Sequence, residues 1–345
     1  MNKLCWILPP VRNFNSGVYL YNKEIISILK KDNNIDIKEI NLPGNKLRYI
    51  YQFLYLPLYI ILNHKKYSYF IYYDESISFL NLFSLGKSVQ IIHDIRFIKA
   101  HTFKEFLKKI YMCINNKFLF LAYKKVVVSK FTGELLNKLG GSYDMVVYNP
   151  IVGLEEIDES NVREDIINIF SQGKKIILNV GSHESRKNIS KIVEVVSLLG
   201  DDFIFVQAGR PIDLTMFNYN KNKALESGCC FYFLNEINRD ELSYLYKNSF
   251  SFICLSSFEG FGRTPIEAQV YSLPVITTIN GGLSEAVLDS AFVVSIDDDI
   301  HALTKKIKLF LSSDDEINVV VNKGIVNSMR FSAEDISNKF KSVIL

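Results

Sequence analysis

The chain has 345 residues, of which 48% are hydrophobic, 13% aromatic and 22% charged. This composition is typical of a folded protein, excludes disorder as the main state and allows two ordinary domains, each with its own core. Residues 1–150 carry 21 Lys and Arg against 10 Asp and Glu, and residues 151–345 carry 19 against 27. The small net charge of +3 is therefore the sum of +11 and −8, and the basic first half indicates an anionic partner.

Membrane-spanning, secreted and metal-binding classes are not favoured. The best candidate for a transmembrane helix, from Tyr49 to Leu62, is too short and contains Pro57. The N-terminus, MNKLCWILPPVRN, has no small-residue cleavage site and is interpreted as a first strand. The five scattered cysteines fit neither a disulfide framework nor metal-ligand spacing. We therefore expect a cytoplasmic protein that needs no metal.

Strand-like and helical segments alternate along the whole chain. In the first half, KLCWILPP is followed by a loop with Gly17 and by a helix from about Val18 to Lys31, and further strands are expected at FIYYD, SVQIIHD and KVVVS. In the second half, strands are expected at KKIILNVGS, DDFIFVQAG, CCFYFL, SFICLS, LPVITT and AFVVS. This alternation predicts an α/β protein with two doubly wound, Rossmann-like parallel sheets. The acidic segment within 149–172 predicts the linker, and thus domains at 1–160 and 161–330.

The segment from Ser251 to Val287 predicts a strand, a tight turn and a short helix. Gly260 and Gly262 permit positive φ and a close backbone approach in the turn, which also contains Phe261, and Pro265 suits the first helical turn. Amides at such a helix start bind anions. Glu259 on the loop and Glu267 in the helix could accept hydrogen bonds from a sugar diol. Phosphate and diol together indicate a nucleotide sugar.

A second anion site is predicted after the strand IILNVGS. Arg186 and Lys187 lie in the following loop, where a guanidinium fork and an ammonium group would neutralise a diphosphate. In a group-transfer reaction, fixed cations stabilise the charge that develops on a leaving diphosphate. An exposed Arg-Lys pair is common on loops, but the site at 259–267 favours function.

Other positions leave two interpretations open. Gly17 would let amides approach a phosphate, although GxGxxG is absent. His93 could bind a sugar hydroxyl or be a hydrogen-bonded histidine at a domain edge, and Asp94 could orient it or bind an acceptor. Arg263 would lie next to the donor. The turn at Gly281-Gly282, followed by Glu285, could contact phosphate or be an ordinary turn.

Lysines are mixed with large apolar residues in LRYIYQFLYLPLYIILNHKKYSYF and in FKEFLKKIYMCINNKFLFLAYKK. This mixture suits helices that lie on a bilayer surface. The alternative is a set of core-facing helices with solvated lysines. Nucleic acid is disfavoured as the anionic partner because no nucleic-acid motif is present.

Taken together, IIHD, VVVSKFTGELL, VVYNP, ILNVGSHESRKNI, FVQAG and EGFGRTPIEAQVYSLPVITT resemble retaining glycosyltransferases of family 4. IIHD and VVVSKFT are most similar to members that build bacterial surface polysaccharides, such as O-antigen mannosyl- or rhamnosyltransferases. The resemblance implies the GT-B fold, with an N-terminal acceptor domain, a C-terminal nucleotide-sugar domain, and a last helix, about 331–345, that returns to the first domain. It also implies transfer with retention and without a metal.

The same resemblance implies roles for individual residues. Arg186 and Lys187 would hold the donor diphosphate, Glu259 would lie near the transferred sugar and Glu267 would bind the ribose. His93 would contact the sugar or the acceptor. The remaining donor-binding residues would be Gly17, Gly181, Gly209, Gly260, Phe261, Gly262 and Arg263. Arg263 stands where many members have an apolar residue, so no donor identity is carried over.

These observations predict a glycosyltransferase that moves a hexose or deoxyhexose from a nucleotide-diphosphate sugar to a lipid-linked oligosaccharide in surface polysaccharide or O-antigen synthesis. Its location would be the inner face of the cytoplasmic membrane. Two alternatives stay open at this point: a nucleotide-sugar 2-epimerase, which would act without an acceptor, and a catalytically silent scaffold in a polysaccharide assembly complex.

Overall fold

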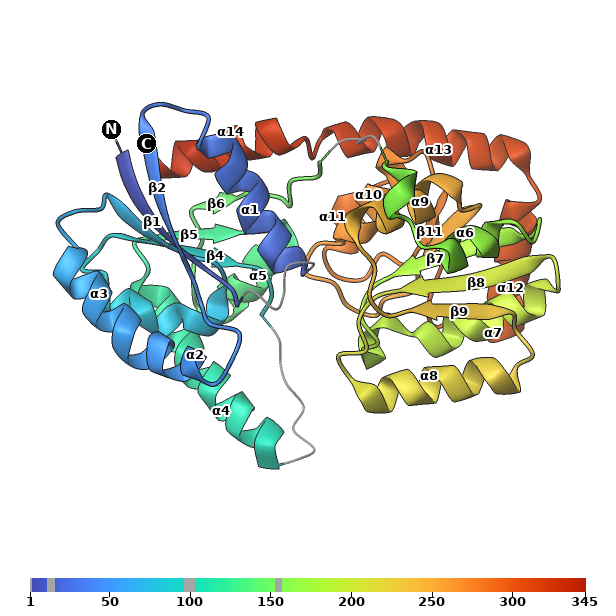
Figure 1. Cartoon of the computed structure of the whole chain (residues 1–345), viewed down its shortest axis with the longest axis horizontal. Coiled ribbons are helices and arrows are strands. Elements are labelled where there is room, and N and C mark those ends of the chain that lie inside the picture. The colour runs from blue at the N-terminus through green and yellow to red at the C-terminus, as the bar shows by residue number, and fades with distance from the viewer. Residues whose placement is uncertain (1, 11–15, 96–102, 153–156) are drawn as a thin grey trace. The chain divides into compact units, whose positions relative to one another are not determined.

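The computed structural model describes residues 2–10, 16–95, 103–152 and 157–345. The chain divides into two compact units (Figure 1). Unit 1 consists of Met1–Val152 together with Phe331–Leu345, and unit 2 consists of Gly153–Arg330. The sequence placed the corresponding boundaries at residues 160 and 330.

Unit 1 is built on a parallel sheet of six strands in the order β2-β1-β3-β4-β5-β6. The strands are β1 (Asn2–Leu8), β2 (Ile35–Asn41), β3 (Tyr69–Tyr72), β4 (Ser88–Ile92), β5 (Lys124–Val127) and β6 (Met145–Val146). The helical segments are α1 (Gly17–Leu29), α2 (Leu47–Ile50), η2 (Tyr51–Tyr55), α3 (Leu56–Asn63), η3 (Glu75–Phe83), α4 (Phe103–Lys117), η4 (Phe118–Leu121), α5 (Lys130–Lys138) and α14 (Ala333–Ile344).

The central strands of this sheet are those that the sequence predicted, whereas the edge strands β2 and β6 were not predicted. β1, β3 and β4 are almost continuously buried and apolar, as expected for strands covered on both faces. β2 reads IDIKEIN, and its exposed Asp36 and Lys38 alternate with isoleucines. Charged residues are typical of an edge strand, and they hide the apolar signal of β2.

The last helix, α14, belongs to unit 1, as the resemblance implied. Ser332 caps it, because the Ser332 Oγ accepts a hydrogen bond from the Asp335 N–H at 3.2 Å. Phe340 is fully buried and stacks on Trp6 of β1 with ring centroids 5.1 Å apart. α14 also packs along α1, as the red and blue helices show in Figure 1. Residues 331–345 thus complete the core of a unit whose other residues lie before position 153.

Unit 2 contains a second parallel sheet, in the order β12-β11-β10-β7-β8-β9. All six strands were predicted: β7 (Lys175–Val180), β8 (Phe203–Ala208), β9 (Phe231–Leu234), β10 (Ser251–Cys254), β11 (Val275–Thr277) and β12 (Phe292–Val293). The helical segments are η5 (Glu159–Asn161), α6 (Glu164–Phe170), η6 (Ser185–Lys187), α7 (Ile189–Leu199), α8 (Leu214–Glu226), α9 (Arg239–Asn248), α10 (Arg263–Val270), α11 (Leu283–Val287), α12 (Ile300–Leu311) and α13 (Asp314–Met329).

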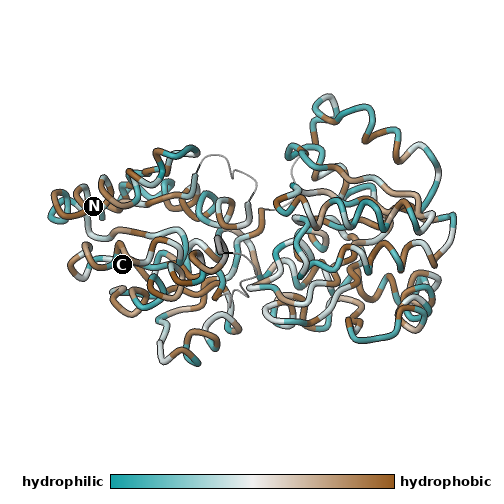
Figure 2. Tube along the Cα trace, turned by 90° about the horizontal axis from the view of Figure 1, so that it is seen from below, coloured by the Kyte–Doolittle hydropathy of each residue, from teal (hydrophilic) through white to brown (hydrophobic). Residues whose placement is uncertain are grey.

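Each unit buries its own apolar core, and hydrophobic residues recur along the chain in both units (Figure 2). In unit 2 the core joins β7, β8, β10 and β11 to α7 and α12, with Phe205, Ile253 and Phe310 at most 1% exposed. In unit 1 a core cluster joins β1 and β3 to α3 and η3. These cores hold the strand ends, and so the loops that follow them, in place.

The strand order creates a topological switch point in each sheet. In unit 2 the chain moves from β7 outward through β8 and β9, and β10 then returns to the other side of β7. In unit 1 the corresponding point lies between β1 and β3. Ligands of open α/β sheets bind beyond the carboxyl ends of the strands at such a point. The loops after β7 and β10 are therefore the first place to look for a site in unit 2.

Candidate functional site

The loops after β7 and β10 are tied together by backbone and side-chain hydrogen bonds. The Ser257 N–H donates to the Arg186 carbonyl at 2.8 Å. Asn188, with φ of 51°, is in the left-handed region, and its side-chain amide donates to the Leu255 carbonyl at 2.8 Å. Asn tolerates this conformation better than most residues. The short η6 turn is thus held with Arg186 and Lys187 facing the loop that carries Glu259.

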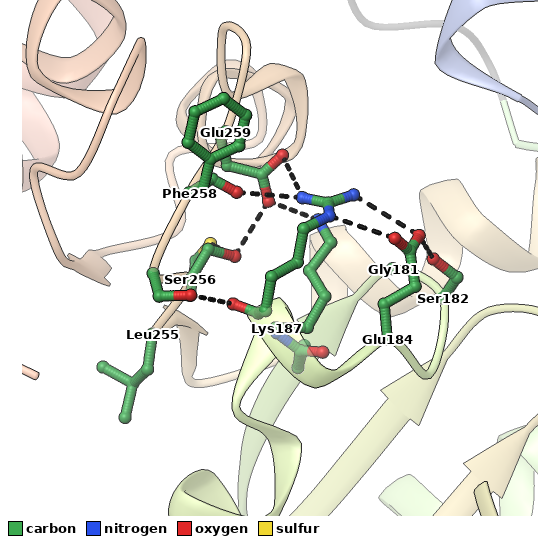
Figure 3. Close-up of polar contacts among 12 residues, drawn as sticks. Gly181, Ser182, Glu184, Lys187, Leu255, Ser256, Phe258 and Glu259 are labelled. Atoms are coloured by element: carbon green, nitrogen blue, oxygen red, sulfur yellow. Dashed lines mark hydrogen bonds and ion pairs between the residues drawn. The ribbon is translucent and has the colours of Figure 1, made fainter. Parts of the chain in front are cut away.

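Glu259 forms ion pairs with both predicted cations, Arg186 and Lys187 (Figure 3). Its Oε2 lies 2.8 Å from Nη1 of Arg186, and its Oε1 lies 2.5 Å from Nζ of Lys187. The Ser256 hydroxyl donates to the same Oε1 at 2.8 Å. Glu184 adds a second carboxylate, whose Oε2 lies 3.1 Å from Nε of Arg186. The sequence predicted Arg186, Lys187 and Glu259 as separate features, and the structure brings them into one cluster.

Electrostatics in this cluster are dominated by pairing within a mostly buried site. Burial alone would raise the pKa of Glu259, but Lys187 and Arg186 outweigh it and hold that pKa at about 2. Burial would lower the pKa of Arg186, whereas Glu259 and Glu184 raise it. The side chains of Arg186, Lys187 and Glu259 are 22%, 11% and 14% exposed. Arg186 and Glu259 are therefore both charged at neutral pH, and the Glu259 carboxylate lies between the Arg186 guanidinium and the Lys187 amine.

Glycines allow the neighbouring loops to approach closely. Gly209, at the end of β8, has φ of 152°, and a Cβ there would lie 2.0 Å from the Gly181 carbonyl oxygen. A Cβ on Gly181 would lie 3.3 Å from Cε of Lys187. The turn after β11 also approaches the Glu259 loop, because a Cβ on Gly282 would lie 2.3 Å from the Gly260 carbonyl oxygen. Backbone at the ends of β7, β8, β10 and β11 thus surrounds the charged cluster.

A second cluster lies on α10, which begins after Gly262. Gly262 has φ of 110° and occupies the N-cap position, Phe261 beside it is 4% exposed, and Pro265 lies in the first turn as predicted. Nε of Arg263 lies 2.5 Å from Oε1 of Glu267, one helical turn away. The buried Tyr246 of α9 donates its hydroxyl to the other oxygen, Oε2, at 3.0 Å. Glu267 is thus held by donors on both oxygens.

The predicted residues of unit 1 lie at the start of α1 and directly after β4. Gly17 is the first residue of α1, whose N-cap Ser16 accepts from the Tyr19 N–H at 3.2 Å. His93 and Asp94 follow β4 directly, and Asp94 is 9% exposed. Burial lowers the pKa of His93 to about 3, so the imidazole is neutral at physiological pH. The His93 ring makes an edge contact with Tyr21, with centroids 4.8 Å apart.

Several polar residues of these sites were missed from the sequence. Asp74 and Glu75 follow β3, and burial raises the pKa of both carboxyls, with Asp74 and Asp94 raising that of Glu75 further. Glu75 accepts the His93 backbone N–H at 3.2 Å. The acidic pair Asp74-Glu75, which begins at the last residue of the predicted strand FIYYD, was a usable signal. No sequence pattern distinguished Glu184, Ser256 or Tyr246, whose roles depend on contacts made across the fold.

The described residues contain neither a metal-binding cluster nor a membrane-spanning helix. In the part of the chain that the structure describes, no group of three or more His, Cys, Asp or Glu side chains is arranged to hold a metal ion. Over the same residues, no helix combines the length and the apolar character needed to span a bilayer.

Comparison with known proteins identifies the second half of the chain. Residues 162–325 match the family model described as "Glycosyl transferases group 1". Unit 2 carries a group 1 glycosyl transferase domain. The matched residues contain both clusters, from Arg186 and Lys187 to Glu259 and Glu267. The resemblance predicted from the motifs is confirmed for this domain.

The curated relatives are mannosyltransferases. The chain is 25% identical over 215 residues to the O-antigen chain mannosyltransferase RfbU of Salmonella typhimurium, covering 60% of this chain and 56% of the relative. It is 27% identical over 172 residues to the alpha-1,3/1,6-mannosyltransferase ALG2 of Dictyostelium discoideum, covering 41% of each. The alignments thus span about half the length of these relatives.

Solved structures share the fold over the full chain. The Anabaena protein HepE, solved in complex with UDP and glucose, superimposes with a TM-score of 0.77 at 14% identity, covering 100% of this chain and 99% of that chain. WaaG, a glycosyltransferase involved in lipopolysaccharide biosynthesis, gives a TM-score of 0.70 at 12% identity, with coverage of 100% and 99%. The predicted GT-B fold with two Rossmann-like sheets is confirmed.

Proposed function

We propose that this protein is a retaining glycosyltransferase, which moves a hexose or deoxyhexose from a nucleotide-diphosphate sugar to an oligosaccharide acceptor in the synthesis of a surface polysaccharide such as O-antigen. The observation that carries the proposal is the Arg186–Glu259–Lys187 cluster at the switch point of unit 2. The group 1 domain match and the mannosyltransferase relatives support it. HepE, solved with UDP and glucose, supports a nucleotide sugar as the donor.

In this reaction the acceptor oxygen forms a bond to the anomeric carbon, and the bond from that carbon to the β-phosphate oxygen breaks. The bonding electrons leave with the diphosphate, whose oxygen takes up the proton that the acceptor hydroxyl loses. Arg186 and Lys187 would stabilise the charge that develops on the leaving group. No step requires a metal, because two cationic side chains are already fixed where the leaving group would bind.

Glu259 would have two successive partners. Without donor, its carboxylate bridges Arg186 and Lys187 and keeps both cations in place. When a diphosphate binds the same cations, the Glu259 carboxylate would turn to hydroxyls of the transferred sugar. Glu267 would bind the ribose, and the backbone at Gly181, Gly209 and Gly260 would line the phosphates and the sugar. In unit 1, Gly17, His93 and Asp94 would contact donor phosphate and acceptor.

The acceptor would be lipid-linked. Unit 1 would bind it at the inner face of the cytoplasmic membrane. α2, η2 and α3 form a continuous run from Leu47 to Asn63 that exposes large apolar side chains. Leu54, Leu58 and Leu62 are 62%, 61% and 81% exposed. Exposed lysines at positions 46, 65 and 66 flank the run. Apolar side chains bordered by lysines suit an anionic bilayer surface.

The decisive experiment measures sugar transfer by Arg186→Met and Lys187→Met variants, with retained fold verified by circular dichroism. Each variant is expected to lose at least a hundredfold in turnover, because removing a donor to transition-state charge costs about 10²–10³ in rate. Lys191→Met on α7 is the matched control, since its ammonium group binds main-chain carbonyls of Ile296 and Asp298. Undiminished turnover in both site variants would refute the proposal. Conversion of the donor sugar without an acceptor would instead favour an epimerase, and a folded wild type that binds no nucleotide would favour a scaffold.

A further inference from the structure

Arg263 is the position where the sequence departs from the family, and the structure shows what it contacts. Arg263 is the first residue of α10, where the helix dipole disfavours a cation. Its side chain is nevertheless mostly buried, at 12% exposure, and its Nε lies 2.5 Å from Oε1 of Glu267. The pair joins positions four apart on one face of the helix. Arg263 therefore holds one oxygen of the Glu267 carboxylate.

Tyr246, on α9, holds the other oxygen of the same carboxylate. It is 2% exposed, and its hydroxyl donates to Oε2 of Glu267 at 3.0 Å. Its ring stacks on Tyr271, at the end of α10, with centroids 5.6 Å apart and planes 16° apart. The Tyr271 hydroxyl donates to Oγ of Ser243 on α9 at 2.8 Å. The tyrosine stack thus joins α9 to α10, and the hydroxyl of Tyr246 donates to the carboxylate whereas that of Tyr271 donates to Ser243.

The two donors fix the plane of the carboxylate while leaving acceptor capacity on it. Each carboxylate oxygen offers two lone-pair directions, so an oxygen that accepts one hydrogen bond accepts a second. Glu267 therefore retains room for two hydroxyl donors, and its side chain is 15% exposed. A vicinal diol presents two hydroxyls at a fixed spacing, and it binds best to a carboxylate that does not rotate. Pre-organisation of this kind reduces the entropy lost on binding.

We propose that Tyr246 and Arg263 are positioning residues that orient Glu267 for the ribose diol of the donor nucleotide. The inference rests on the proposed function, since Glu267 is a ribose ligand only if the donor is a nucleotide sugar. A purely structural alternative exists, in which Glu267 simply satisfies a buried tyrosine hydroxyl. The two differ in what they predict for ribose recognition.

The test measures dissociation constants by calorimetry for a nucleoside diphosphate and for its 2′,3′-dideoxy counterpart. Wild type is expected to bind the ribose form about tenfold or more tightly, as hydrogen bonds to a charged group would give. Tyr246→Phe should lose most of that ratio while its affinity for the dideoxy form stays within about twofold. Arg263→Met should also lose most of the ratio, and Arg263→Lys should restore part of it, because lysine returns a charged donor.

Tyr271→Phe is the matched control, since it removes a hydroxyl of the same stack that donates to Ser243, whereas the Tyr246 hydroxyl donates to Glu267. Its ribose-to-dideoxy ratio should equal that of wild type. An unchanged ratio in Tyr246→Phe, or an equal loss in Tyr271→Phe, would overturn the inference while leaving the transferase proposal intact. If wild type binds no nucleoside diphosphate at all, the proposed function falls, and the positioning role falls with it.

Discussion

Glu259 shows how a single side chain can serve both stability and binding. Its carboxylate is 14% exposed and is paired with Arg186 and Lys187, so it remains charged in a site where burial favours the neutral form. Removing the acid takes the carboxylate away from Lys187 and leaves Arg186 with Glu184, and breaking a buried ion pair in this way is strongly destabilising. We expect the unliganded protein to depend on Glu259 for the stability of unit 2.

This dependence has a defined direction with pH. The pKa of Glu259 is about 2 in the folded chain, against an ordinary value of 4.5. A lowered folded pKa means that its contribution to stability is complete above about pH 4.5 and is lost as the pH falls toward about 2. The difference in unfolding free energy between wild type and Glu259→Gln should fall by about half or more between about pH 5 and about pH 3.

Urea unfolding followed by far-ultraviolet circular dichroism measures that difference. The control is Glu194→Gln, which removes the carboxylate of a more exposed ion pair with Lys223, where N and O are 2.6 Å apart. Exposed pairs contribute little, so this variant should differ from wild type by less than about 1 kcal/mol at each pH. A Glu259→Gln difference that stays constant from about pH 5 to about pH 3 would contradict the electrostatic account of the cluster.

At the scale of elements, the run from Leu47 to Asn63 exposes large apolar side chains that packing in the core of unit 1 does not explain. Leu56 and Ile60 are fully buried and hold the run against β1 and β3, whereas the opposite side exposes apolar side chains. Helices that only cover a sheet expose polar residues on the outer face. The exposed apolar side is therefore expected to contact a bilayer.

Replacing Leu58 and Leu62 together by Glu should reduce binding to vesicles of anionic phospholipid by at least tenfold, because charge would replace apolar burial in the interface. Leu309→Glu, at a 64% exposed position of α12 in unit 2, provides the matched control and should bind as wild type does. Sedimentation with vesicles measures both. Equal binding by the double variant and the control would rule out this surface, and absence of wild-type binding at low salt would rule out the membrane proposal.

The elements also show which strands and site residues could be predicted from the sequence. Strands covered on both faces, such as β4 and β10, were predicted because their apolar runs are continuous. The edge strand β2 was missed because its charged residues obscure the alternation. Among site residues, Arg186, Lys187 and Glu259 were predicted from local motifs. Tyr246 was not predicted, because its contact with Glu267 depends on the packing of α9 against α10, which no local pattern encodes.

On the scale of the whole molecule, we expect the cores of the two units to unfold in separate transitions that different spectroscopic signals follow. Trp6 is the single tryptophan of the chain and lies in unit 1, where it stacks on Phe340 of α14. In unit 2, Phe310 is equally buried and stacks on Phe292 with centroids 4.3 Å apart. Tryptophan fluorescence therefore follows unit 1 specifically.

Phe340→Ala should destabilise unit 1 by about 3–5 kcal/mol, the usual cost of removing a buried phenylalanine. The midpoint of the Trp6 fluorescence transition in urea is expected to fall accordingly. Phe310→Ala is the matched change in unit 2, and it should leave that midpoint in place while shifting the circular dichroism transition. Identical shifts of both signals in both variants would show that the two cores unfold as one.

The return of the chain to unit 1 also has a consequence for how the protein is made. Residues 1–152 leave the ribosome first, yet the face of β1 and α1 that α14 covers stays bare until residues 153–330 have been added. At roughly 5–20 residues per second, this interval lasts on the order of ten to forty seconds. During that time Trp6 and the apolar residues around it are open to chaperones and to other nascent chains. We therefore expect unit 1 to finish folding only after unit 2 has been synthesised, although most of unit 1 is synthesised first.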